Sequence, residues 1–107
     1  MNRSDLLFRA FADPIRRRAV RLLGRRSLCV CDLTDALRLP QPTVSRHLSS
    51  LQRAGLVRVE KRGRWRHYAL AAAKDGLVAS LLKSAAAEAD DAGDLRRLKT
   101  LPRRACD

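Results

Sequence analysis

Residues Leu39–Leu56 read LPQPTVSRHLSSLQRAGL. Within this stretch Val44, Leu48 and Leu51 recur at helical spacing and form one apolar stripe. The pattern predicts an amphipathic helix from Pro40 to Ala54, which a glycine ends. The face opposite the stripe and the N-terminal end of the helix are polar. They are expected to present Gln41, Thr43, Ser45, Arg46, His47 and Ser50.

Short polar side chains near the start of a helix suit the major groove of duplex DNA. Their amide, hydroxyl and guanidinium groups match the donors and acceptors on base edges there. Arg53 lies farther along the same helix and is better placed for a phosphate. A solvated surface helix would show the same pattern, but it would leave the neighbouring elements unexplained.

A hairpin is expected directly after this helix. Alternation of apolar and charged residues predicts strands at Val57–Arg62 and Trp65–Leu70, around a turn that contains Gly63. Four cations surround the turn: Lys61, Arg62, Arg64 and Arg66. Such a tip suits phosphate or minor-groove contact, and the alternative is a hairpin tip kept soluble by its charge.

The other segments read as helices. Asp13 followed by Pro14 is an N-cap followed by a first-turn proline. Helices are expected at 4–12, 14–23, 28–37 and from Asp75 onward, with a last turn or two near residues 95–101. The order ααααββα makes the fold mainly α with a β-hairpin (α+β), a winged helix-turn-helix whose wing is the hairpin. Residues 1–88 are expected to form the DNA-binding and dimerisation domain, and residues 89–107 a C-terminal tail that carries Cys106.

The charge is unevenly distributed along the 107 residues. The net charge is +12, and residues 1–74 hold 17 basic and 5 acidic side chains, so this part carries the whole excess. A domain with positive charge confined to one part is expected to bind a polyanion, although an arginine-rich proteome would also raise the charge. Aromatic residues make up only 4% of the chain, which disfavours the base-stacking platforms of single-strand binders. Duplex DNA is the better candidate.

Several other classes of protein do not fit. No apolar run approaches the roughly 18 residues of a membrane span, and the polar, arginine-containing N-terminus does not resemble a signal peptide. A cytoplasmic location is expected, where cysteines serve as thiols or metal ligands more often than as disulfides. No nucleophile triad, phosphate loop or paired carboxylates suggest an enzyme.

Cys29 and Cys31 lie two residues apart, shortly before the predicted reading helix. On a regular helix their side chains would diverge, whereas an extended backbone places them on one side. One ion can therefore bridge both sulfurs where the helix starts after them or gives way. Helix N-termini favour the thiolate, and thiolates select soft ions. The alternative is a pair of small buried apolar side chains.

Four stretches together resemble a known family, the ArsR/SmtB metalloregulatory winged-helix repressors, from about Phe8 to Leu70. They are Ala12–Arg16, Leu28–Leu33, Gln41–Leu48 and Ala54–Val57. The resemblance implies a homodimer joined through its first and last helices. It also implies binding to an inverted-repeat operator in double-stranded DNA and release when an inducer ion binds.

Within that family, Cys-Val-Cys-Asp-Leu looks like the arsenite or antimonite site of arsenic-operon repressors, and ligands occur at the same place in some cadmium- and lead-sensing relatives. Arsenic repressors often carry a third cysteine where this chain has Thr34, and a capping Ser or Thr where it has Pro40. Cys106 is the candidate third sulfur, and an incidental tail thiol is the alternative. A zinc site on the last helix is not supported, since residues 75–107 contain no histidine.

The leading hypothesis is a repressor of an arsenic-resistance operon, with arsenite, antimonite or another thiophilic ion as inducer and no cofactor otherwise required. The same fold sensing cadmium, lead or thiol oxidation is the main alternative. A non-specific architectural DNA-binding protein and a thiol oxidoreductase fit less well. A disulfide across one intervening residue is sterically strained, which weakens the last of these.

Overall fold

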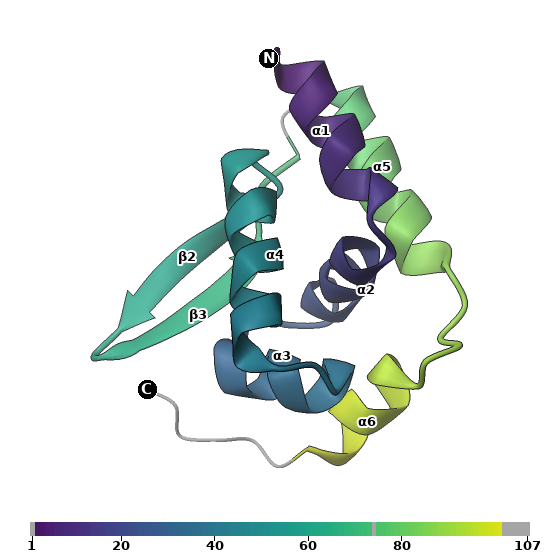
Figure 1. Ribbon diagram of the computed structural model, residues 1–107. Coiled ribbons are helices and arrows are strands. Elements are labelled where there is room, and N and C mark those ends of the chain that lie inside the picture. Colours follow the sequence, from purple (N-terminus) through teal and green to yellow (C-terminus); the bar gives the residue numbers. More distant parts are fainter. Residues whose placement is uncertain (1, 74, 102–107) are drawn as a thin grey trace.

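The computed structural model describes residues 2–73 and 75–101, in which a small three-stranded sheet lies at one side of six packed helices (Figure 1). The elements in chain order are α1 (Arg3–Ala12), α2 (Pro14–Leu23), β1 (Leu28–Cys29), α3 (Val30–Leu37), α4 (Gln41–Arg53), β2 (Val57–Arg62), β3 (Trp65–Leu70), α5 (Gly76–Ala87) and α6 (Asp94–Thr100). The winged helix-turn-helix expected from the sequence is confirmed, with β1 and α6 added to the expected order.

Local capping explains where the helices begin and end. Asn2 caps α1 by accepting the Asp5 N–H at 2.9 Å, so the cap lies two residues before the Ser4 expected from the sequence. Asp13 Oδ1 accepts the Ile15 N–H at 2.8 Å and starts α2. Arg38 adopts a left-handed conformation (φ 56°), which ends α3 and lets the chain turn into α4 within three residues.

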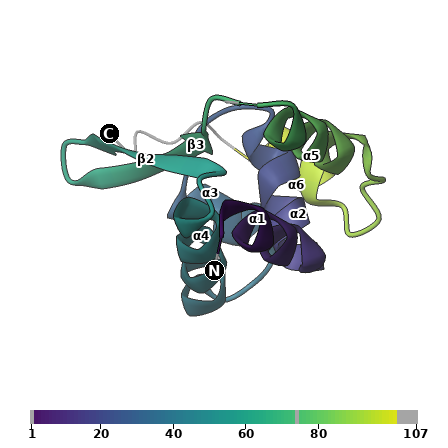
Figure 2. The same ribbon diagram turned by 90° about the horizontal axis from the view of Figure 1, so that it is seen from above.

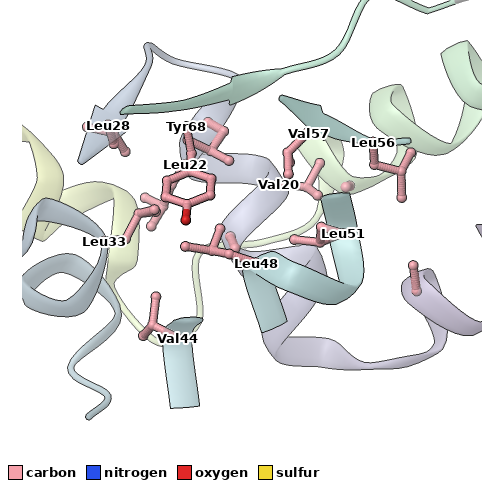
Figure 3. Packing of buried hydrophobic residues seen from close by; sticks show 14 of the residues in the cluster. Val20, Leu22, Leu28, Leu33, Val44, Leu48, Leu51, Leu56, Val57 and Tyr68 are labelled. Carbon is pink, nitrogen blue, oxygen red and sulfur yellow. The ribbon is translucent and has the colours of Figure 1, made fainter. Parts of the chain in front are cut away.

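Helix α2 lies at the centre of the molecule and packs against α1, α3, α4, α5 and α6. The core around it consists mainly of leucine and valine side chains (Figure 3). Leu22 from α2, Leu33 from α3 and Leu48 from α4 are each fully buried there. This packing fixes the helix-turn-helix pair α3–α4 against the rest of the domain.

The sheet has the strand order β1-β3-β2, and all its pairs are antiparallel. Strands β2 and β3 have the bounds expected for the wing, and Figure 2 shows this hairpin extending away from the helices. The expectation of helix from Leu28 onward was wrong for two residues. Leu28 and Cys29 instead pair with Tyr68 and His67 as a short edge strand. The thiol segment is thereby joined to the wing.

The segment after residue 88 does not stand apart from the domain. Helix α6, which begins after Gly93 (φ 79°), packs against α2 and α3, and Leu98 belongs to the common core. The side chain of Asp94 is completely buried between these helices. Residues 89–101 are therefore part of the packed unit, where a tail was expected.

Candidate functional site

The polar face of α4 is open to solvent, as expected for a reading helix. Gln41, Arg46 and Arg53 are exposed, and Thr43, Ser45 and Ser50 are partly exposed. Pro40 occupies the N-cap position without a side-chain hydrogen bond, so the first N–H groups of α4 receive no side-chain cap. These groups and side chains could all reach a duplex placed against this face.

The placement of His47 on this face was wrong. Its side chain is buried, with 7% of the residue exposed, and its Nδ1 accepts a hydrogen bond from Arg16 Nε at 3.2 Å. Burial is the main cause that lowers the pKa of His47; the charge of Asp13 opposes it, and the smaller effects of the Arg16 and Arg46 charges reinforce it. The hydrogen bond between Arg16 and His47 therefore links α2 to α4, and the buried His47 side chain is not exposed for contact with DNA.

The wing carries its cations on the outside. Lys61, Arg62, Arg64 and Arg66 are all exposed around the turn. The Arg64 guanidinium lies 6.0 Å from the ring centroid of Trp65, within the range of a cation–π contact. Glu60 forms hydrogen-bonded ion pairs with Arg58 and Arg62, and these guanidinium groups lower the pKa of its carboxyl group. One wing cation is thus partly neutralised within the hairpin.

The two cysteines lie on either side of the start of α3. Cys29 is the last residue of β1 and the N-cap of α3, with an extended backbone (φ −79°, ψ 166°), whereas Cys31 is the second residue of the helix. Cys29 is 2% exposed and Cys31 is partly exposed. The helix therefore starts between the cysteines. The backbone is extended at Cys29 and helical at Cys31, so the pair is neither wholly extended nor wholly helical.

Thr34 stands where the family resemblance would place a third cysteine, and its Oγ1 donates a hydrogen bond to the Cys31 carbonyl at 2.8 Å. Among residues 2–73 and 75–101, no group of three His, Cys, Asp or Glu side chains is arranged to hold a metal ion. The described part of the site supplies two thiols, which fits a soft ion that takes further ligands from elsewhere. Cys106 lies outside the described residues.

Pairing in the sheet adds a neighbour that sequence reasoning missed. Cys29 lies directly opposite His67 of β3, and Glu60 of β2 lies opposite His67 on its other side. Residues directly opposite one another point to the same face of a sheet, so these three side chains share the face away from Leu28 and Tyr68. A two-residue strand gives no periodic signal that could have revealed this.

Carboxylates of the C-terminal third neutralise three arginines of α2. Arg17 pairs with Glu88 at 2.8 Å, Arg18 with Asp94 at 2.8 Å, and Arg21 with both Asp94 and Asp90. These three α2 arginines are therefore already paired with carboxylates within the domain.

A family model, related sequences and solved structures all point to the same protein family. The family model described as "Bacterial regulatory protein, arsR family" matches residues 13–59. An uncharacterised HTH-type transcriptional regulator of Methanocaldococcus jannaschii is 46% identical over 63 residues, which cover 58% of this chain and 71% of that protein. The arsenical resistance operon repressor of Escherichia coli K12 is 48% identical over 65 residues, which cover 60% of this chain.

The chain spans just over half, 56%, of the length of the Escherichia coli repressor. Among solved structures, the cadmium metal-sensor CMTR of Mycobacterium tuberculosis superimposes with a TM-score of 0.59 at 38% identity, covering 75% of this chain and 80% of the sensor. The chain therefore belongs to the arsR family of bacterial regulatory proteins, whose members are DNA-binding transcriptional regulators rather than enzymes.

Proposed function

We propose that the protein is a cytoplasmic repressor of an arsenic-resistance operon. It binds an inverted-repeat operator as a homodimer and releases it when arsenite or antimonite binds the thiolates of Cys29 and Cys31. The observation that carries this proposal is the position of the two cysteines at the junction of β1 and α3. The junction contacts both elements that we propose to face DNA, the wing and the reading helix.

The connection runs in two directions from the thiols. The backbone of Cys29 pairs with β3, a strand of the wing, and α3 packs directly against the reading helix α4. An ion that draws the two sulfurs together must change the backbone where α3 begins, because a helical Cys31 and an extended Cys29 point in different directions. That change moves the support of α4 and the base of the wing together.

The proposed third sulfur is that of Cys106, which lies outside the described residues. Helix α6 packs on α3, and Arg97 of α6 donates to the Ala36 carbonyl near the end of α3 at 2.7 Å. The helix that precedes the C-terminal residues thus lies against the helix that carries Cys31.

Exposed apolar side chains support the homodimer. Phe8 on α1 is 57% exposed, and Leu77, Leu81 and Leu82 on α5 are only partly buried. The starts of these two helices are joined by the ion pair between Arg3 and Asp75. A second copy that covers α1 and α5 would bury this surface and place two reading helices on one side of the dimer.

The direct test begins with a duplex selected from a random library by the wild-type protein. Its affinity is then measured by fluorescence anisotropy with and without arsenite, for the wild type, Cys29→Ser, Cys31→Ser and the double variant. Arsenite should weaken wild-type binding at least tenfold and leave the double variant bound. Release of the double variant by arsenite would refute the thiol mechanism, and failure to select any duplex would refute operator binding.

Cadmium or lead is the second candidate inducer, since the Mycobacterium tuberculosis structure belongs to a cadmium sensor. The same titration with each ion ranks the inducers. X-ray absorption of the arsenite-loaded protein counts the sulfur ligands. Three sulfurs in the wild type and two in Cys106→Ser would identify the third ligand, whereas three in both would exclude Cys106.

A further inference from the structure

A hollow of about 220 Å³ lies where α1, α2 and α4 meet. It is lined by Leu6, Arg9 and Ala10 of α1, Arg16 of α2, and Ser50 and Arg53 of α4. Three of these six side chains are arginines and none is acidic. We propose that this hollow holds a backbone phosphate of the bound DNA, clamped by Arg9, Arg16 and Arg53.

The polar groups of the hollow are held in place before any ligand binds. Arg16 donates through Nε to His47 Nδ1 at 3.2 Å and through Nη1 to the Arg9 carbonyl at 3.1 Å. Arg53 Nη2 donates to Ser50 Oγ at 3.3 Å. Each guanidinium has five N–H donors, so most of them remain available to oxygen acceptors. Fixed guanidinium groups suit a phosphate because they can bind its oxygens in pairs.

The charges of these arginines are balanced differently from those of their neighbours on α2. Arg17, Arg18 and Arg21 all form ion pairs with carboxylates of the C-terminal third. None of the ion pairs seen among residues 2–73 and 75–101 involves Arg9, Arg16 or Arg53. Asp5 and Asp13 each lie four residues from Arg9, and Asp13 uses its Oδ1 to cap α2. Asp13 lines a neighbouring hollow with Arg9 and Arg16, so one carboxylate faces three cations, and the positive charge that remains can be neutralised by an external anion.

The position of the hollow favours DNA over a free anion. Ser50 belongs both to its wall and to the exposed polar face of α4, and its Oγ donates to the Arg46 carbonyl at 3.3 Å. A duplex against that face brings its phosphates past the C-terminal half of α4. The role of α1 and α2 in this contact was not visible from the sequence, since Arg9 and Arg16 lie 32 and 25 residues before the first residue of α4. The inference rests on the DNA binding of the proposed function and adds a third contact region to the reading helix and the wing.

The test uses the full chain and the duplex selected by the wild type. Binding is measured from 50 to 300 mM KCl for Arg9→Gln/Arg53→Gln, with Arg25→Gln as the matched control because Arg25 is an exposed arginine outside the hollow. The pocket variant should bind about tenfold more weakly at low salt, and its slope of log K against log salt should be smaller by about 0.9, one phosphate contact. The Arg9→Lys/Arg53→Lys variant keeps the charge and should recover most of the slope. Thermal unfolding of each variant confirms that it is folded.

Several results would overturn the inference. One is a salt slope of Arg9→Gln/Arg53→Gln (the pocket variant) equal to the wild-type slope. Another is a loss of duplex affinity in the pocket variant no larger than that in Arg25→Gln. The third is saturable binding of inorganic phosphate to the hollow in the absence of DNA. A scan with single methylphosphonates in the duplex adds an independent criterion. One neutralised phosphate should weaken the wild type and leave the pocket variant unaffected. If the salt and methylphosphonate experiments give these contrary results while arsenite still releases the wild type from DNA, only the phosphate-clamp inference is refuted. The proposed function is refuted if the wild type selects no duplex or if no thiophilic ion releases the selected duplex.

Discussion

Replacing Asp94 with asparagine tests how strongly α6 is held to the domain. The carboxylate of Asp94 is completely buried, and its Oδ1 accepts from Arg18 Nη2 at 2.8 Å and from Arg97 Nη2 at 3.0 Å. Its Oδ2 accepts from Arg18 Nε at 2.8 Å and from Arg21 Nη2 at 3.4 Å. Asparagine keeps the shape and one acceptor but turns an NH2 group toward the guanidinium groups, which leaves buried positive charge without its counterion.

The expected loss follows from this geometry. Removing one partner of a buried ion pair costs about 3–5 kcal/mol. Arg18 and Arg97 retain 23% and 19% side-chain exposure, so water can partly hydrate them in the variant, and we expect the lower end, about 3 kcal/mol. For a domain of this size that corresponds to a melting temperature lower by roughly 12 °C.

Urea unfolding followed by far-UV circular dichroism measures this difference. The protein concentration is held fixed, because an oligomer would make the midpoint depend on concentration. Asp91→Asn is the matched control, since Asp91 is exposed and lies three residues earlier, in the loop before α6, and it should change stability by less than about 0.5 kcal/mol. If Asp94→Asn unfolds within 0.5 kcal/mol of the wild type, the buried network does not hold α6, and the reasoning is refuted.

Three further predictions concern the wing, the reading helix and the dimer. Glu60→Gln removes the partner of Arg62 and should raise duplex affinity about two- to fivefold at low salt and less at high salt, which anisotropy can measure. Because burial lowers the pKa of His47, the unfolded chain binds its proton first, so stability should fall as pH drops below about 6.5, by at most about 1.4 kcal/mol per pH unit. His47→Gln should reduce that slope in urea titrations between pH 7 and 5.5, and an unchanged slope would argue against the burial. Phe8→Glu places a charge on the exposed apolar face of α1 and should shift the protein toward monomer in light scattering, whereas an unchanged mass would exclude this face from the dimer.

The sequence predicted the strands of the wing to the residue because they alternate with a clear period around a glycine turn. It could not predict β1, since Leu28 and Cys29 become a strand through pairing with residues almost forty positions away. His47 was misplaced for a similar reason. It lies at the edge of the apolar stripe, and its acceptor role depends on Arg16, which packs against it from another helix. The cysteine site was found by its residue types, but its backbone conformation depends on where the sheet ends and α3 begins.

The neutralisation of α2 by the C-terminal third has a consequence for how the molecule can meet nucleic acid. Arg17, Arg18 and Arg21 already have carboxylate partners, so a second duplex approaching that side would have to displace them. The α2 surface with these three arginines therefore offers a second duplex guanidinium groups that are already paired, and displacing the carboxylates would cost binding free energy.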